Sequence, residues 1–200
     1  MNKNRTLAKA TSTVMAAAML ASAISPAAFA EGSQKYTVTE TAYGYNLVEQ
    51  EDGKTLSYSP ESGVTLLEDD GYAFKDLNQN GELDAYEDWR LSTADRAKNL
   101  ADLMVADGRD GIESIAGLML YSAHTKVSSE TVSGTEIDSR ARTQDGSTTM
   151  DAITTNKLRH VLVTSIASPE IGAKWSNNLQ SIVEGMDYGI PCNNSSDPRH

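Results

Sequence analysis

Short runs of alternating hydrophobic and polar residues, separated by turn residues, fill the chain from Tyr36 to about Tyr72. Within "YNLVEQEDGKTLSYS", two strand-like runs meet at Asp52-Gly53, a pair that tight hairpin turns prefer because their central residues need positive φ. The next stretch, "SGVTLLEDDGYAF", is typical of a further strand. The pattern therefore predicts a β-rich segment over residues 31–73.

A helical pattern begins after residue 91. Ser92, with Asp95 three residues later, resembles a capping box. Apolar residues then recur at the spacing of one helix face, at Ala97, Leu100, Ala101 and Met104. Farther on, "SIAGLMLYS" (114–122) is a short continuous apolar run, which predicts a strand buried on both faces.

A polar stretch of about 35 residues follows that run. It is rich in Ser, Thr, Gly and Asp, and it is long for a connection without structure in a compact domain. We therefore expect a functional loop there, or a short helix that the pattern does not reveal. Order resumes at "KLRHVLVTS", a β-branched run that predicts a strand.

The clearest helix of the chain comes next. Ser168 can cap it, Pro169 suits its first turn, and Gly189 is expected to end it. One stripe carries its apolar residues: Ile171, Trp175, Leu179, Ile182, Val183 and Met186. "IPCNNSS" then reads as another strand. Strand, helix and strand at this spacing predict a βαβ unit with parallel strands.

The first thirty residues have the pattern of a secretory signal. Basic residues open the segment, an apolar run covers about residues 13–24, and Ala28-Phe29-Ala30 has the small-x-small pattern of a cleavage site. The apolar run is too short for a permanent membrane helix. We expect cleavage after Ala30 and a secreted protein, and no other segment is apolar enough to anchor it in a membrane.

Removal of the signal makes the chain strongly acidic. The first thirty residues hold three of the 17 Lys and Arg and none of the 28 Asp and Glu, so the remainder has a net charge of 14 − 28 = −14. Such a charge argues against nucleic acid or an anionic membrane as partner. The single cysteine, Cys192, can form no internal disulfide and is expected to be a small buried residue.

Oxygen-bearing side chains are concentrated in "DLNQNGELDAYE" (76–87). A calcium ion takes six to eight oxygens, and a twelve-residue loop can supply them if alternate side chains point inward and a central glycine makes the sharp turn. Gly81 is at the sixth place. The expected donors are the side chains of Asp76, Asn78, Asn80, Asp84 and Glu87 and the backbone carbonyl of Glu82.

The same loop has an alternative without metal, because Asp, Asn and Gly are also the residues of ordinary surface turns. If calcium binds, the site is expected to be structural and solitary, since the preceding "GVTLLEDDGYAFK" reads as strand and turn and not as an entering EF-hand helix. We expect the loop to join the β segment to the first helix, with Leu83 and Trp89 as its apolar contacts.

From Phe74 to His200 the chain resembles secreted bacterial glycoside hydrolases of family 3, the β-glucosidase and β-xylosidase group. The resemblance is carried by "FKDLNQNGELDAYEDWR", "IAGLML", "LRHVLV" and, most specifically, "KWSNNLQSIVEGMDYGIPCNNSSDPRH". It implies a (β/α)₈ TIM-like barrel beginning at residues 92–200, after the calcium loop at 74–91. It also implies retaining hydrolysis of β-linked terminal sugars, with no organic cofactor and with calcium in a structural role.

The resemblance assigns one substrate residue. The strand after "GIP" ends in an Asp that hydrogen-bonds sugar hydroxyls in such enzymes, and Asp197 has that place. The alternative is that Asp197-Pro198 simply caps the next helix. His124 is expected to lie near the same end of the sheet as Asp197, without a role in substrate binding. The nucleophilic and acid/base carboxylates come from later segments, so none of these 200 residues is nominated as catalytic.

Two or three parallel strands with helices on one side leave the other sheet face and both edges open, so we expect the chain to be the front part of a larger α/β enzyme that is inactive alone. One alternative is a calcium-dependent extracellular interaction module of the dockerin kind, although a second loop is not found. Calcium-triggered binding to a protein partner would favour that alternative. A barrel that binds sugar without catalysis is a third possibility.

Overall fold

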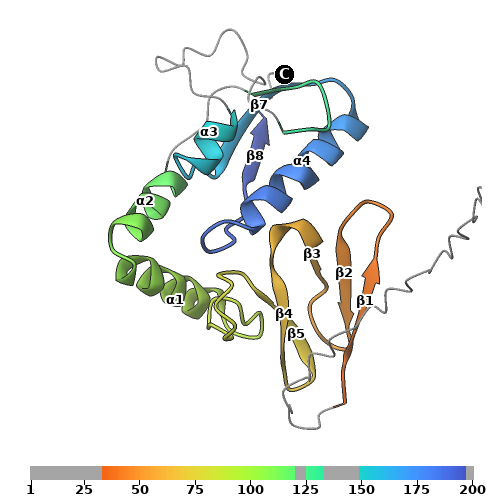
Figure 1. Ribbon diagram of the computed structural model, residues 1–200, viewed down its shortest axis with the longest axis vertical. Coiled ribbons are helices and arrows are strands. Elements are labelled where there is room, and N and C mark those ends of the chain that lie inside the picture. The colour runs from red at the N-terminus through yellow and green to blue at the C-terminus, as the bar shows by residue number, and fades with distance from the viewer. Residues whose placement is uncertain (1–32, 120–124, 133–148, 197–200) are drawn as a thin grey trace, which may run out of the picture. The chain divides into compact units, whose positions relative to one another are not determined.

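The computed structural model describes residues 33–119, 125–132 and 149–196. Its N-terminal part contains two antiparallel sheets (Figure 1). One has the order β1-β2-β3 and the other is the hairpin β4-β5. The bounds are β1 Tyr36–Glu40, β2 Asn46–Gln50, β3 Leu56–Tyr58, η1 Pro60–Ser62, β4 Thr65–Asp69 and β5 Tyr72–Asp76. The predicted β-rich segment is therefore confirmed, and its last strand runs three residues past the expected bound.

The turns of these sheets differ from the prediction in one respect. Asp52-Gly53 does lie between β2 and β3, which are antiparallel, but only Asp52 has positive φ there, at 55°. The two-residue turn with both central residues at positive φ joins β4 and β5, where Asp70 has φ 52° and Gly71 has φ 80°. The further strand predicted within 62–74 is accordingly a hairpin, because Asp-Gly at 70–71 supplies the required conformation.

Helix α1 (Thr93–Ala106) begins as predicted, since the Ser92 hydroxyl accepts a hydrogen bond from the Asp95 N–H at 3.1 Å. Its covered face is displaced from the predicted one, because Ala97 and Ala101 are exposed while Leu100, Leu103 and Met104 are covered.

The strand expected at 114–122 was wrong over its described residues, because residues 109–118 form the helix α2 (Arg109–Leu118), and residues 120–122 lie outside the described part of the chain. Its buried positions are Gly111, Ser114 and Gly117, a spacing of three that belongs to a helix. A Cβ at Gly111 would lie 1.7 Å from the Met104 carbonyl oxygen, and one at Gly117 would lie 2.1 Å from that of Lys157. The backbone of α2 thus packs closely against neighbouring backbone at these two glycines. An apolar run in the sequence does not indicate such packing, so it does not distinguish this helix from a strand.

The C-terminal part contains a parallel sheet of order β6-β7-β8, formed by β6 Thr125–Val127, β7 His160–Ile166 and β8 Asn193–Ser196. β7 and β8 are joined through helix α4 (Pro169–Glu184), which confirms the predicted βαβ unit. The polar stretch before β7 holds the unpredicted β6 and the short helix α3 (Thr149–Thr154). Helix α4 ends at Glu184, earlier than expected, and Gly189 lies in the following turn with φ 62°.

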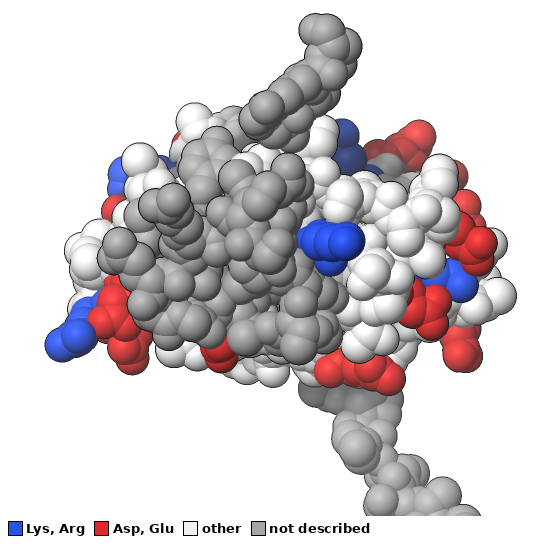
Figure 2. All heavy atoms as spheres, turned by 90° about the horizontal axis from the view of Figure 1, so that it is seen from above, with Lys and Arg blue, Asp and Glu red and all other residues white. Residues whose placement is uncertain are grey.

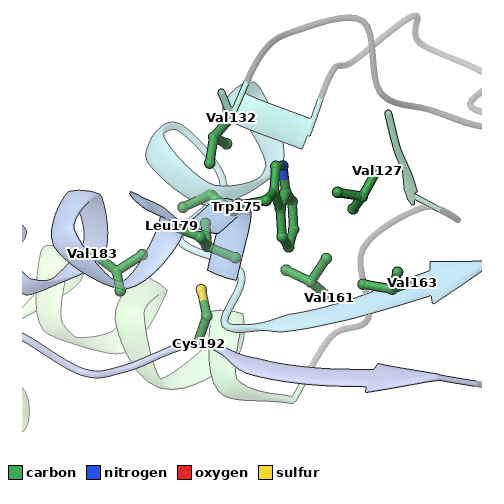
Figure 3. Close-up of a cluster of buried hydrophobic side chains, with 9 residues drawn as sticks. Val127, Val132, Val161, Val163, Trp175, Leu179, Val183 and Cys192 are labelled. Atoms are coloured by element: carbon green, nitrogen blue, oxygen red, sulfur yellow. The ribbon is translucent and has the colours of Figure 1, made fainter. Parts of the chain in front are cut away.

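One apolar core holds this unit together. Trp175, Leu179 and Val183 of α4 are fully buried against Val161 and Val163 of β7, with Val127 and Cys192 beside them (Figure 3). The predicted stripe of α4 is confirmed, since Ile171, Ile182 and Met186 pack on the same cluster. The Ser168 hydroxyl accepts the Ile171 N–H at 3.2 Å and caps the helix as expected.

Three parallel strands do not distinguish the opening of a (β/α)₈ barrel from an open sheet, so the barrel stays a prediction. Over the described residues the three strands form no closed ring. The predicted boundaries at residues 73, 91 and 92 likewise stay predictions.

The end of α4 contacts the N-terminal β region. The Glu184 carboxylate accepts from the Lys75 ammonium at 2.7 Å and from the Ser59 N–H at 2.9 Å. Next to it, a Cβ at Gly185 would lie 2.4 Å from the Ser62 carbonyl oxygen. The segment around η1 therefore packs directly against the last turn of α4.

The acidic side chains of the described surface are dispersed. Figure 2 shows one face, on which Asp and Glu are spread around the margin with single Lys and Arg residues among them. No large patch of one sign is seen there, so the negative net charge acts as a diffuse field on that face.

Candidate functional site: the acidic loop and the carboxyl end of the sheet

The predicted calcium loop joins the end of β5 to the start of α1. Asp76 is the last residue of β5, and the chain reverses through Gln79 and Gly81, whose φ values are 57° and 78°. Nothing lies within 4 Å of where a Cβ at Gly81 would stand. Glycine is therefore favoured there by its backbone conformation and not by crowding.

Two buried carboxylates close the loop from its ends. The Asp76 oxygens accept the N–H groups of Asn80 and Gly81, each at 3.0 Å. The Glu87 oxygens accept the N–H groups of Leu77 at 2.7 Å and Asp84 at 3.0 Å. Each carboxylate residue is only 4% exposed, so the first and twelfth places of the loop are both turned inward.

The middle places are linked through Asp84. The side-chain amides of Asn78 and Asn80 donate to the same Asp84 oxygen at 2.7 and 2.9 Å. Their own oxygens accept the backbone N–H groups of Asn80 and Glu82. Five of the six predicted donor residues are thus connected to one another, and the exposed Glu82 takes part through its backbone.

The negative charge of the loop lacks a cationic partner. Among ion pairs between described residues, none reaches Asp76, Asp84 or Glu87. Burial raises the pKa of Glu87, although the N–H groups of Asp84, Leu77 and Asn78 oppose that rise. Within the described ranges, no three His, Cys, Asp or Glu side chains gather closely enough to hold a metal by themselves, so any ion here needs the Asn oxygens and a backbone carbonyl as well.

Tyr86 is a feature of the loop that the sequence pattern did not single out. The residue is 5% exposed, and among the described residues its buried hydroxyl makes no hydrogen bond of regular geometry, although it interacts with the Glu87 carboxylate. Burial raises its pKa first, and the nearby carboxylates of Glu87, Asp84 and Asp76 raise it further. The only sequence signal is its place directly before the last acidic residue of the loop.

The loop is anchored mainly through residues other than the predicted ones. Tyr86 packs with Met104 of α1 and Tyr188 of the turn before β8, and Leu77 packs against this cluster. The Tyr86 N–H donates to the Asn99 side chain at 2.9 Å. Leu83 is half-buried and is not a member of this cluster, so the contact expected of it is supplied by Leu77 and Tyr86.

Trp89 fulfils the role predicted for it. Its ring stacks on Phe74 of β5 with centroids 5.3 Å apart, and its indole N–H donates to the Ala73 carbonyl at 3.0 Å. The loop therefore joins β5, α1 and the turn before β8, which confirms that it links the β segment to the first helix.

The predicted substrate residue Asp197 lies outside the described residues, as does His124. Asp197 directly follows Ser196, the last residue of β8, and β8 is parallel to its neighbour β7. The carboxyl end of the strands is the end at which α/β enzymes keep their chemistry, and the role of Asp197 stays a prediction.

Cys192 is buried beneath α4, as expected, and burial raises the pKa of its thiol to about 11. Such a thiol is protonated at neutral pH and is a poor nucleophile. The side chain serves packing in this structure, in accord with the prediction.

The amino end of the sheet has a small hollow of about 10 Å³, lined by residues of α2, of the segment before β7 and of the turn before β8. Its size is roughly the room that one water needs. Arg159 beside it is buried and donates to the carbonyls of Ile153 and Ile190, both at 3.1 Å. This hollow is therefore too small for a sugar.

Among the described residues, no helix is both long and apolar enough to cross a bilayer. No model of a known protein family matches the chain.

The chain is 34% identical over 139 residues to a periplasmic beta-glucosidase/beta-xylosidase of Dickeya chrysanthemi. That match covers 68% of this chain and 19% of the relative, so the chain spans about a fifth of the length of the curated relative that it matches. The similarity supports a relationship to glycoside hydrolases.

Proposed function

We propose that the chain supplies the opening part of an exported glycosidase that hydrolyses β-linked terminal sugars in the manner of family 3. The observation that carries this proposal is the 34% identity to a periplasmic beta-glucosidase/beta-xylosidase. A parallel pair of strands joined through a helix, as β7 and β8 are, is also compatible with such an enzyme.

Within this proposal Asp197 binds substrate. A carboxylate at a strand end accepts strong hydrogen bonds from neighbouring sugar hydroxyls and so orients the ring for attack. Retaining hydrolysis also needs a nucleophilic and an acid/base carboxylate about 5 to 5.5 Å apart. We infer that both come from outside these 200 residues and that the chain alone does not hydrolyse glycosides.

We also propose that the loop 76–87 binds calcium in a structural role. The donor set fits a hard cation, because it combines three carboxylates, two amide oxygens and the Glu82 carbonyl. The buried carboxylates of Asp76 and Glu87, which lack cationic partners among the described residues, also favour it. The cation would neutralise this charge, while β5 and α1 hold the two ends of the loop.

Export is the third part of the proposal, with cleavage after Ala30. The relative is a periplasmic protein, and residues 1–30 have the pattern of a signal. Expression with the native N-terminus should give an exported protein whose first residue is Glu31. A retained N-terminal segment would contradict this part alone.

A chimera tests the enzymatic proposal. The matching segment of the Dickeya enzyme is replaced by this chain, and hydrolysis of 4-nitrophenyl β-glucoside and β-xyloside is measured. The chimera should be active, Asp197→Ala should remove most of the activity, and Glu170→Gln on the exposed side of α4 should leave it unchanged. An inactive but folded chimera, or hydrolysis by the 200-residue chain alone, would contradict the proposal.

A further inference from the structure

Two tyrosines stand at the tip of the β1–β2 hairpin, a part of the molecule that the proposed activity does not use. Tyr43 is 77% exposed, and its ring lies nearly parallel to that of Tyr45, at 17° with centroids 6.4 Å apart. A large aromatic ring left this open to solvent gains little from packing, and exposed aromatic surface is typical of binding sites.

The turn that carries these rings is held in a single conformation. Thr41 donates both its N–H and its hydroxyl to the Tyr45 carbonyl, at 2.9 and 2.7 Å. The Gly44 N–H donates back to the Thr41 carbonyl at 3.3 Å, and Gly44 has φ 83°. The rings are therefore presented on a preorganised support, which lowers the entropic cost of binding.

Tyr45 lies two residues before Leu47, so strand alternation places it on the same face of the sheet as Leu47, and polar side chains follow on that face. The register pairs Thr39 with Leu47, Thr37 with Glu49, and Leu47 with Ser57, so these residues share a face with one another. The exposed members are Thr37, Thr39, Glu49 and Ser57. On the opposite face Val48 is fully buried. The solvent face thus combines an aromatic end with a row of hydroxyls and one carboxylate.

This combination suits a sugar chain. A β-linked glucan or xylan has flat C–H faces that stack on aromatic rings, and hydroxyl edges that exchange hydrogen bonds with hydroxyl and carboxylate groups. The net charge of residues 31–200, 14 − 28 = −14, disfavours polyanions, and the face has too few apolar side chains for the core of a stable protein interface.

We propose that the face defined by Tyr43, Tyr45, Thr37, Thr39 and Glu49 is an accessory binding site for β-linked polysaccharide, separate from the site at Asp197. The choice of a β-linked ligand rests on the proposed function. Such a site would hold the enzyme on its polymeric substrate while the chemistry takes place at the carboxyl end of the parallel sheet.

Native gel electrophoresis of the chain, with hydroxyethyl cellulose or xylan in the gel, tests this inference. The wild-type chain should be retarded by at least one of the two polymers. Tyr43→Ala should weaken the apparent affinity about tenfold, whereas Tyr43→Phe should keep it, since stacking needs the ring and not the hydroxyl. Val38→Ala, a change of an exposed apolar residue on the same strand, is the matched control and should behave as the wild type.

The other outcomes overturn either this inference or the enzymatic proposal. If neither polymer retards the chain, the proposed site does not exist. If Tyr43→Ala and Val38→Ala lose polymer affinity equally, the loss reflects damage to the sheet and not removal of a ring. Loss of binding in Asp197→Ala with retention in Tyr43→Ala would relocate binding to the hydrolytic site. An active chimera without polymer binding would refute this inference alone, whereas polymer binding with an inactive chimera would refute the enzymatic proposal alone.

Discussion

The parallel unit and the N-terminal β region are held together by different forces. Around α4, nine buried residues form one contiguous apolar cluster, to which β6, β7, α3 and α4 contribute together with Cys192 just before β8. At the loop 76–87, the corresponding cluster of described residues has three buried members, and hydrogen bonds and an ion pair make much of the connection. Stacked rings, carboxylate to N–H bonds and the Lys75–Glu184 pair connect the β region to its neighbours.

This contrast teaches how a small β region keeps its place beside a larger unit. Apolar burial grows with the size of a layer, and short strands offer little of it. Bonds to buried carboxylates fix geometry but contribute only modest net free energy each. The β region should therefore respond to ions and salt, and the parallel unit should respond to changes of side-chain volume.

The largest effect is expected from the centre of the apolar cluster. Trp175→Ala removes a side chain that is 1% exposed, and the free energy of unfolding should fall by about 3–5 kcal/mol. Trp89→Ala is the matched change in the other region, and its loss should be smaller because that ring is only half-buried. Denaturant titrations of both variants measure the difference. Equal losses of unfolding free energy in Trp175→Ala and Trp89→Ala would contradict the contrast between the two regions.

Calcium should have the next largest effect. Sites in extracellular modules have dissociation constants of about 0.1–1 mM, so 10 mM calcium should stabilise the chain by about 1.4–2.7 kcal/mol over a chelated sample. Thermal unfolding with calcium or with chelator measures this.

Variants of the loop make the calcium test specific. Glu87→Gln should abolish the calcium effect, whereas Glu82→Gln should keep it, because only the backbone carbonyl of Glu82 is a proposed donor. If neither Glu87→Gln nor a chelator changes the midpoint of thermal unfolding, the loop is an ordinary surface turn without calcium.

Loss of a helix cap should have a smaller effect. Ser168→Ala removes the hydroxyl that accepts the Ile171 N–H and should cost about 1 kcal/mol, while Ser168→Thr should retain most of the stability. Equilibrium unfolding in denaturant is the measurement. A loss as large as that of Trp175→Ala would mean that the cap, and not the apolar stripe, holds α4 in place.

The smallest effect is expected from the link between the regions. The side chains of Lys75 and Glu184 are 25% and 12% exposed, so solvent weakens their attraction and the coupling should be about 0.2–1 kcal/mol. A double-mutant cycle with Lys75→Met and Glu184→Gln measures it, at low and at high salt. The exposed pair Lys98–Asp102 is the control and should show no measurable coupling. If the coupling energy of Lys75 and Glu184 does not change with salt, packing and not charge attraction would hold the two side chains together.

The sequence predicted the elements whose signals are local. The cap at Ser168, the stripe from Ile171 to Met186 and the strand pair joined through α4 each follow from residues close together in the chain. The turn at Asp70-Gly71 has the same local signal as Asp52-Gly53, but register and loop length, which depend on the partner strands, decide which one is tight.

The sequence did not predict features that depend on distant neighbours. α2 is a helix because Gly111 and Gly117 touch the backbone of Met104 and Lys157, and no local pattern reports such contacts. At the loop, the acidic and amide residues were predictable from their spacing. The burial of the Tyr86 hydroxyl depends on packing against Met104 and Tyr188, so it was not.

The Glu184 contact has a consequence for the order of events during synthesis. Its partner Ser59 lies 125 residues earlier in the chain. At 5–20 residues per second, the ribosome needs roughly 6–25 s to add the residues between them. For that interval the early strands exist without the support on which they later rest, so they must persist as local hairpins or wait unfolded for the end of α4.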